Sequence, residues 1–288
     1  MTSISNKKLL QCVAAVGAAF AVQAAGAAEV VRAATAGTKM FVANNATDQM
    51  FAIDVTTLSA SALGATGVDV GFGGLGFANN GTLYGFNSGN AGLYTVNTRS
   101  GAWTLVGTGG TSCGDTFDIS PVNGTAYVVN ICSGTLDRVD LATGASSLAA
   151  TLTGWSMSAG SAFGEDGSLY FMDIGGASVR RTDVLTGVTN VVGNTGISPG
   201  VLTNLAYNPD DDQLYAVGLN NGTLYRFNPL TGAGASLGLI GGLPTGGQIT
   251  MSTFQIAAAE QGVPEPTSAA LVLAALAAAA AAARRRRA

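Results

Sequence analysis

The sequence predicts an all-β fold: a five-bladed β-propeller of four-stranded antiparallel blades, between an N-terminal signal helix and a C-terminal transmembrane helix. Two landmarks recur along the chain, both stepping by 43, 43, 43 and 45 residues. The first is an aromatic residue, at Phe41, Tyr84, Tyr127, Tyr170 and Tyr215. The second opens a turn 13 residues later, at Asp54, Asn97, Asp140, Asp183 and Asn228. A four-stranded unit with a period of about 40–45 residues is typical of a propeller blade.

The stretch 74–110 shows the four expected strands of one repeat. Three turn signals divide it: Asn80-Gly81, Ser88-Gly89-Asn90 and Arg99-Ser100-Gly101. Short alternating runs between such turns are the pattern of an antiparallel meander. Within a propeller domain at 39–257, we expect blades two to five at about 75–109, 115–152, 161–193 and 202–241.

The first blade lacks an inner strand of its own. Its other strands are expected at 39–42, 49–54 and 61–67, whereas 249–256 (ITMSTFQI) follows the repeats without a blade. Because a propeller must close into a ring to remove its open edges, we assign 249–256 beside 39–43. The alternative closing strand is 30–34, which is nearby but weakly patterned.

Residues 1–28 have the pattern of a secretory signal peptide. Lys7 and Lys8 precede an apolar run at 9–20, and small residues allow cleavage near Ala27 or Ala28. The run is shorter than the ~20 apolar residues that a membrane span needs. We therefore expect export, with a short leader at 29–38 before the first blade.

Two cysteines, Cys113 and Cys132, lie beyond the signal peptide. A hairpin turn at 121–124 places them opposite each other across the first two strands of the third blade. Export leads to an oxidising compartment, where such a pair forms a disulfide worth about 2–4 kcal/mol.

The exported part is acidic. Six of the 13 Lys and Arg residues lie in the two chain ends but only one of the 17 Asp and Glu residues does, so the part between them carries a net charge near −9. Without a basic stripe, nucleic acid and anionic membrane surfaces are not expected partners. The chain has no histidine, which excludes Ser-His-Asp and Cys-His nucleophile systems and His-ligated zinc.

A polar position also repeats three residues after the aromatic landmark, at Asn44, Asn87, Asn130, Asp173 and finally Gly218. In a propeller these positions share one face, around the central channel. With Asp115 and Asn204, before or within the inner strands, they form a possible ligand face for Ca²⁺ or a polyol. The alternative is that each side chain caps its own turn. Residues 210–212, three aspartates, suggest a solvated turn or a surface calcium site; no other cofactor is expected.

The C-terminal end combines three features in order. A linker at 258–267 contains Val263, Pro264, Glu265 and Pro266. An apolar run at 268–283 follows, and the tail at 284–288 begins with Arg284, Arg285, Arg286 and Arg287. Arginines beside an apolar helix stay on the cytoplasmic side, which would hold the preceding domain outside.

This combination resembles the PEP-CTERM sorting signal of exported bacterial proteins. The resemblance implies recognition by an exosortase, a membrane-embedded transpeptidase, with cleavage near Pro264 to Pro266. It also implies an inner-membrane intermediate, held by the C-terminal helix after passage through the secretion machinery. The domain is then transferred to the cell surface or an extracellular polymer.

Two classes of function fit these features. The first is a binding or structural module of the envelope or biofilm, which uses its loop face for a glycan or a surface protein. The second is a metal-dependent propeller hydrolase or lyase, using Ca²⁺, which requires acids or amides that converge at the axis. Because no general base is distinguishable, we favour the non-enzymatic class.

Overall fold

A computed structural model describes residues 38–156, 158–173, 177–197, 202–244 and 248–255. The regular elements in these residues are strands, and they form five four-stranded antiparallel sheets, which confirms the predicted propeller. The expected signal peptide, most of the leader, and the C-terminal segments 258–267, 268–283 and 284–288 lie outside the described residues. Within the described ranges, no helix has the length and apolar character needed to cross a bilayer.

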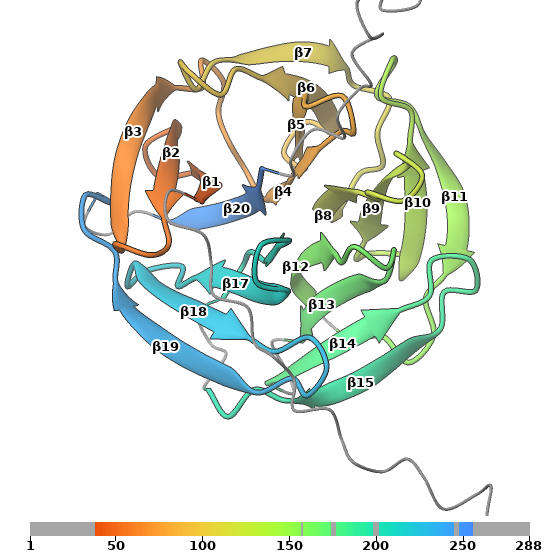
Figure 1. Cartoon of the computed structure of the whole chain (residues 1–288). Coiled ribbons are helices and arrows are strands. Elements are labelled where there is room, and N and C mark those ends of the chain that lie inside the picture. The colour runs from red at the N-terminus through yellow and green to blue at the C-terminus, as the bar shows by residue number, and fades with distance from the viewer. Residues whose placement is uncertain (1–37, 157, 174–176, 198–201, 245–247, 256–288) are drawn as a thin grey trace, which may run out of the picture. The chain divides into compact units, whose positions relative to one another are not determined.

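Each blade has an inner strand at the axis, two middle strands and an outer strand at the rim (Figure 1). From axis to rim, blade one comprises β20 (Ile249–Phe254), β1 (Lys39–Asn44), β2 (Gln49–Asp54) and β3 (Ser59–Ala65). Blade two comprises β4 (Gly73–Phe77), β5 (Leu83–Asn87), β6 (Gly92–Val96) and β7 (Trp103–Gly107). Blade three comprises β8 (Gly114–Ile119), β9 (Ala126–Asn130), β10 (Thr135–Val139) and β11 (Ser146–Thr151). Blade four comprises β12 (Ser158–Phe163), β13 (Leu169–Asp173), β14 (Ser178–Thr182) and β15 (Thr189–Asn194). Blade five comprises β16 (Ala206–Asn208), β17 (Gln213–Val217), β18 (Thr223–Phe227) and β19 (Gly234–Leu239).

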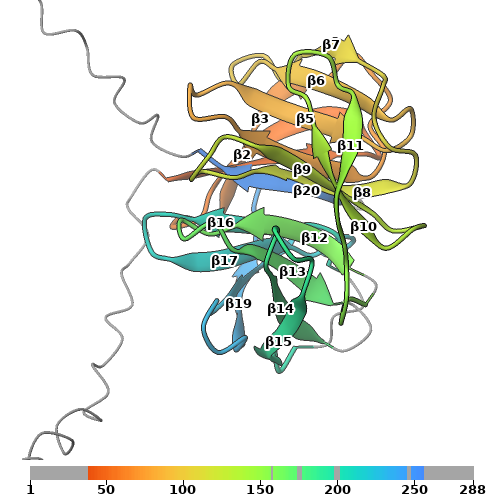
Figure 2. The same cartoon turned by 90° about the vertical axis from the view of Figure 1, so that its right-hand side faces the viewer.

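The hydrophobic core lies between neighbouring blades. Five buried clusters each draw side chains from two adjacent sheets, so the apolar face of every blade is covered. Between blades two and three, Phe86 stacks on Phe117 with ring centroids 6.0 Å apart. Between blades five and one, Tyr215 meets Phe254 at 5.2 Å. The clusters therefore continue around the whole ring, which Figure 2 shows from its edge with β11 toward the viewer.

The ring closes through the strand that the sequence assigned to blade one. β20 pairs antiparallel with β1, with Met40 opposite Phe254 and Ala43 opposite Met251. The assignment of 249–256 is confirmed over its described part, because Ile249–Phe254 is the inner strand of blade one. The alternative segment, 30–34, lies outside the described residues. Blade one thus joins the two ends of the repeat region.

The two sequence landmarks have different structural roles. The aromatic residue lies on the second strand of each blade; it is buried in four blades, as Tyr127 is at 3 % exposure, and Tyr84 of blade two is half-buried. The polar landmark caps the turn between third and fourth strands: Asp54 Oδ1 accepts the N–H groups of Thr56 at 2.9 Å and Thr57 at 3.1 Å. The same capping recurs at Asn97, Asp140, Asp183 and Asn228. Core packing and turn capping thus account for the shared spacing.

Each capped turn also joins its blade to the preceding one, and we call it the interblade turn. Four residues after the polar landmark the chain adopts positive φ, at Leu58, Gly101, Gly144, Gly187 and Gly232. Two residues later, a backbone N–H donates to a carbonyl of the preceding blade. The five bonds are Ala60 to Gly241 (2.7 Å), Trp103 to Thr66 (2.8 Å), Ser146 to Gly109 (3.1 Å), Thr189 to Thr153 (2.8 Å) and Gly234 to Thr195 (2.8 Å).

Glycine is needed in these turns because two backbones meet there. A methyl group on Gly187 would overlap the carbonyl oxygen of Thr151 on the preceding blade, and the φ of Gly187 is 73°. Blade one departs from this pattern with Leu58, at a φ of 53°. Its side chain packs against the apolar cluster between blades five and one. At the ring closure, the apolar contacts of Leu58 therefore offset the strain of a positive φ at a residue other than glycine.

The predicted disulfide is present. Cys113 lies directly before β8 and Cys132 lies in the turn after β9, with their Cα atoms 5.8 Å apart. The N–H of Ile131 donates to the carbonyl of Cys113 at 3.1 Å, which extends the pairing of the two strands to the disulfide. The bond therefore ties the segment leading into an inner strand to the neighbouring turn.

We expect Gly187→Ala to destabilise the protein by about 3 kcal/mol or more, because it combines left-handed backbone strain with overlap of two backbones. The matched control is Gly196→Ala, at a φ of 67° with no atom within 4 Å of the added methyl group. This control should cost only about 1–2 kcal/mol. Urea unfolding measures both losses; equal losses would contradict the role given to the interblade turn.

Cys132→Ser should lower the free energy of unfolding by about 3 kcal/mol, because the disulfide closes a loop with a sequence separation of 19 residues. Thermal unfolding with and without a reducing agent provides the measurement. The reductant should lower the midpoint temperature of unfolding of the wild-type protein and leave that of Cys132→Ser unchanged. A reductant effect of equal size on both proteins would contradict this assignment.

Candidate functional site

The described chain begins and ends on the same face of the wheel. β1 begins at Lys39, opposite Asp54, and β20 ends at Phe254, opposite Met40. We call this the exit face; it carries the first–second strand turns and the interblade turns. The opposite loop face carries the second–third strand turns and the loops that lead into the inner strands. The predicted ligand-face positions therefore lie opposite the side from which the C-terminal segment leaves.

On the loop face, Asn87 holds together two segments of its own blade. Its Oδ1 accepts the N–H groups of Gly89 (3.0 Å), in the following turn, and of Gly71 (3.2 Å), before the inner strand. Its Nδ2 donates to the carbonyl of Asp69 at 2.7 Å. All these groups belong to the blade itself, so the amide serves as a clamp between two loops.

Asn130 and Asn44 occupy the same position in blades three and one. Asn130 Nδ2 donates to Thr111 Oγ1 at 2.6 Å, which again reaches the segment before the inner strand. The Oδ1 atoms cap the following turns, accepting N–H groups from Cys132 and Ser133 for Asn130 and from Ala46 and Thr47 for Asn44. These contacts match the turn-capping alternative drawn from the sequence.

In blade four a carboxylate and an arginine replace the amide. Asp173 is 2 % exposed, and its Oδ2 accepts from Arg180 Nε at 2.8 Å and Nη2 at 2.7 Å. Arg180 Nη1 donates to the carbonyl of Gly154 at 2.7 Å, before the inner strand β12. Arg180 thus reaches the segment before the inner strand, as the Nδ2 atoms of Asn87 and Asn130 do in their blades. Its positive charge also compensates the buried negative charge of Asp173.

In blade five, where the repeat places Gly218, Asn204 supplies the missing contacts. Its Oδ1 accepts the N–H of Val217 at 3.0 Å, and its Nδ2 donates to the carbonyl of Val217 at 2.8 Å. The same Nδ2 also reaches the carbonyl of Ile249 at 3.1 Å, on the inner strand of blade one. Asn204 therefore contributes to ring closure.

Asp115 differs from the other loop-face candidates, because it makes no hydrogen bond or ion pair with any described residue. It lies on β8 where the pairing with β9 skips one residue, between Gly114 and Thr116. Burial raises the pKa of its carboxyl to about 6. Asp115 therefore lies near the axis alone, since no other polar side chain among the described residues forms a hydrogen bond or ion pair with its carboxylate.

The axis is closed by backbone at the level of the inner strands. A methyl group on Gly74 of β4 would overlap the backbone of Phe117 on β8, and one on Gly160 of β12 would lie 2.6 Å from the Leu205 nitrogen. The space bounded by these strands is too narrow to admit water. In the part of the chain described, no three Asp, Glu or Cys side chains are grouped to hold a metal ion.

The acidic turn at 210–212 directs its carboxylates to different partners. Asp210 accepts from the Thr38 hydroxyl. Asp211, 1 % exposed, accepts the Tyr215 hydroxyl at 2.5 Å, and Asp212 accepts that of Tyr207 at 2.9 Å. The bond to Thr38 fixes the start of the described chain against blade five.

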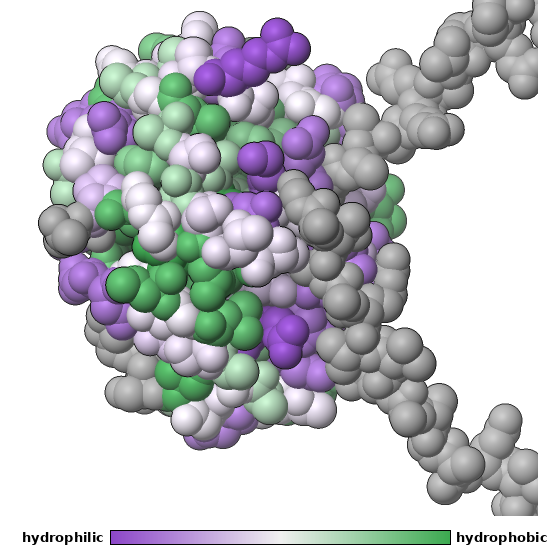
Figure 3. Space-filling view, turned by 60° about the vertical axis from the view of Figure 1, so that its left-hand side comes forward, coloured by the Kyte–Doolittle hydropathy of each residue, from purple (hydrophilic) through white to green (hydrophobic). Residues whose placement is uncertain are grey.

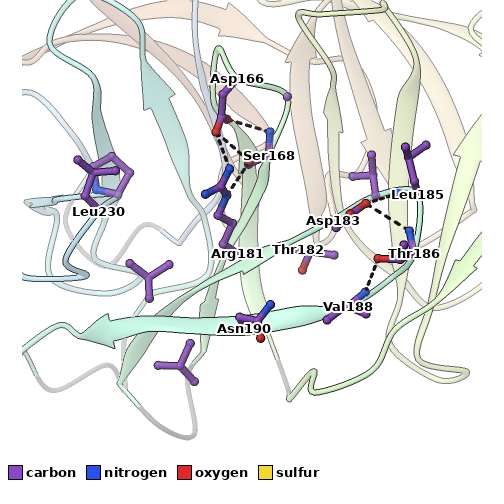
Figure 4. Close-up of a pocket in the computed structure, with 15 residues that line it drawn as sticks. Asp166, Ser168, Arg181, Thr182, Asp183, Leu185, Thr186, Val188, Asn190 and Leu230 are labelled. Carbon is purple, nitrogen blue, oxygen red and sulfur yellow. Dashed lines mark hydrogen bonds and ion pairs between the residues drawn. The ribbon is translucent and has the colours of Figure 1, made fainter. Parts of the chain in front are cut away.

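The exit face carries grooves that the sequence did not predict. The larger, about 700 Å³, lies on blade four beside Pro229 and Leu230 of blade five (Figure 4). At one end, Arg181 Nη2 pairs with Asp166 Oδ2 at 2.8 Å, and Arg181 Nε donates to Ser168 Oγ at 2.7 Å. A groove of about 530 Å³ lies at the corresponding place on blade three. A sequence signal exists: arginine recurs at Arg138, Arg181 and Arg226, with the 43- and 45-residue steps of the repeat.

The rim of the wheel exposes aliphatic side chains on its outer strands. Leu105, Leu148, Val191 and Leu239 are each more than half exposed. Figure 3 shows hydrophobic residues in patches between polar ones, over the side of the wheel that carries blades one and five. Scattered surface aliphatics of this kind are common in soluble domains and do not by themselves define a site.

Comparison with known proteins identifies the C-terminal signal. Residues 262–287 match the family model of the PEP-CTERM protein-sorting motif, which confirms the resemblance drawn from the sequence. The motif indicates an exported protein that is processed at the membrane by an exosortase. No curated protein is significantly similar to this chain.

Solved structures share the fold. A chain in the crystal structure of a nidogen/laminin complex superposes with a TM-score of 0.54 and 12 % identity, covering 76 % of this chain and 99 % of that one. A selenomethionine-substituted virginiamycin B lyase from Staphylococcus aureus gives a TM-score of 0.41 and 14 % identity, covering 62 % of this chain and 58 % of that one. The likeness to the nidogen/laminin chain shows a shared fold.

Stability should fall as pH rises from about 4 to 7, because burial raises the pKa of Asp118 to about 7 and that of Asp115 to about 6. The folded protein binds more protons than the unfolded chain in this window, so unfolding releases protons. Asp118 accepts N–H groups from Phe163 and Ile119, both at 2.7 Å, which only partly offsets its burial. Urea unfolding across this range should show a shallower pH slope for Asp118→Asn; an unchanged slope would contradict the assignment.

Proposed function

We propose that this protein is a non-enzymatic binding module of the cell surface or extracellular matrix. The proposed route is export through the secretion machinery, retention at the inner membrane by the C-terminal helix, and release by an exosortase. The observation that carries the proposal is the sorting motif at 262–287, which follows the propeller in the sequence. The last residue that the structure describes before the motif is Gln255. A glycan or another surface protein is the proposed ligand.

The topology of the wheel supports this role. Because β20 ends on the exit face, a chain held by its C-terminal segment keeps that face toward its attachment point. The exit face, which carries the grooves on blades three and four, is then held toward the surface or polymer to which the protein is attached. Five blades linked by backbone hydrogen bonds, with a disulfide inside blade three, provide a rigid platform for such a module.

The alternative, a Ca²⁺-dependent hydrolase or lyase, has less support. It requires several polar side chains directed at one point near the axis. Asn44, Asn87, Asn130 and Asp173 instead engage their own blades, and Asn204 bonds to Val217 and Ile249. Asp115 is the remaining acid, and a single carboxylate provides neither a Ca²⁺ coordination sphere nor an acid–base pair.

Changing Pro264, Glu265 and Pro266 together to alanine should block processing, because these residues form the proposed recognition sequence. We expect the intact mass of the variant to retain the arginines at 284–287 and the variant to remain in the membrane fraction. The unvaried protein should lack those arginines and appear at the surface or in the medium. Deletion of the exosortase should reproduce the variant's behaviour.

Arg181→Gln provides the matched control, because it changes the exit face without touching the motif. It should be processed like the unvaried protein. If the triple variant is processed normally, or the unvaried tail persists in cells that contain the exosortase, the proposed sorting route is wrong.

A further inference from the structure

Arginine occupies one repeated position on the third strands of blades three, four and five. Arg138, Arg181 and Arg226 lie opposite the aromatic landmarks of the second strands, Tyr127, Tyr170 and Tyr215 respectively. The three guanidinium groups therefore stem from equivalent backbone positions near the exit face. What faces each arginine depends on the first–second strand turn of its blade.

In blades four and five that turn supplies an acid. Asp166 pairs with Arg181 at 2.8 Å, as Figure 4 shows. The equivalent residue in blade five, 45 positions later, is Asp211. Burial raises the pKa of Asp211, and the charge of Arg226 offsets part of that rise. Both arginines thus have a carboxylate of their own blade nearby.

Blade three has an amide in that place. Asn123 stands 43 positions before Asp166, and the turn is built in the same way. Asn123 Oδ1 accepts the N–H of Thr125 at 2.9 Å, as Asp166 Oδ1 accepts that of Ser168 at 2.9 Å. The second side-chain atom, an acceptor oxygen in Asp166, is therefore a donor nitrogen in Asn123.

In blade three, the Arg138 guanidinium and the Asn123 amide have no carboxylate of the first–second strand turn to accept their hydrogen bonds. Arg138 is exposed and makes no ion pair or hydrogen bond with any described residue. The hydroxyl of Thr125 occupies the position of Ser168, which accepts from Arg181 in blade four. The groove of about 530 Å³ contains Arg138, Thr125, Asp140, Ser146 and Ser147. An arginine without a paired carboxylate thus lies in a groove lined by three hydroxyl groups and the Asp140 carboxylate.

We propose that this groove binds the carboxylate of a uronic acid unit in an acidic polysaccharide. The carboxylate takes the place beside Arg138 that the Asp166 carboxylate takes beside Arg181, and it forms a charge-assisted pair. The sugar hydroxyls exchange hydrogen bonds with Thr125, Ser146 and Ser147. This inference rests on the proposed function as a binding module and gives that module a ligand class.

The hydroxyl groups of the groove, and not its charge, favour a uronate over an acidic peptide. Asp140 lies in the same groove, and the part of the chain between the two targeting ends carries a net charge near −9. This negative charge repels a uronate chain and an acidic peptide alike, so the sugar hydroxyls must distinguish the two ligands. A uronate brings one carboxylate per ring, surrounded by hydroxyls, one of which can donate to the second carboxylate oxygen of Asp140.

The test is calorimetric titration of the purified protein with a linear oligomer of galacturonic acid. The probes for comparison are its methyl-esterified form and an oligoglutamate of matched charge. We expect the free acid to bind and the ester to bind about tenfold more weakly or not measurably. Equal binding of acid and ester, or tighter binding of oligoglutamate, would overturn the proposal. So would the absence of binding by all three probes.

Two variants locate the site. Arg138→Gln removes the guanidinium, and Asn123→Asp supplies the internal carboxylate that blade four has; each should weaken binding about tenfold or more. Arg181→Gln, whose arginine is already paired, should bind like the unvaried protein. Undiminished binding by Asn123→Asp would refute the site even if Arg138→Gln failed to fold. Loss of binding with normal exosortase processing would leave the proposed sorting intact, so the two proposals fail separately.

Discussion

The wheel depends on the contact between each interblade turn and the outer strand of the preceding blade. At this point two backbones meet, and a backbone hydrogen bond links them in all five blades. Apolar packing between the sheets alone would tolerate sliding, because hydrophobic attraction has no preferred direction. The backbone bonds set the position of each blade against its neighbour, and the close approach explains why four of the five turns contain glycine at positive φ.

The same geometry bears on the search for a functional site. With the inner strands in backbone contact, the axis has no described cavity at that level, and the polar residues around it support the loops. Asn87 uses both ends of its amide for this purpose, and Arg180 performs the same task for Asp173. A polar residue that repeats at a propeller face can therefore serve to hold the loops of each blade together, and its repetition does not by itself indicate a ligand site.

Differences between the repeats are more informative about binding than the features they share. Arg181 and Arg138 occupy equivalent positions, but only the first has a carboxylate in its turn. The grooves lie on the exit face, whereas the sequence directed attention to the loop face. The sorting motif, in contrast, is a property of a short segment and does not depend on the wheel, so the destination and the ligand are separate questions.

From the sequence alone we predicted the number of blades, the disulfide between Cys113 and Cys132 and the C-terminal motif, and we favoured 249–256 over 30–34 as the strand that closes the ring. Each of these follows from spacing or local chemistry: a 43-residue period, the strand left over at 249–256, a hairpin register and a Pro-Glu-Pro triplet before an apolar run. The tertiary structure was needed to show that the inner strands leave no water-sized space between them, and that the amides of Asn87, Asn130 and Asn204 bond within the wheel. It also showed the groove around Arg138, beside an amide where the next blade has an acid. These features depend on distances between residues of different strands and blades, which a pattern along one chain does not contain.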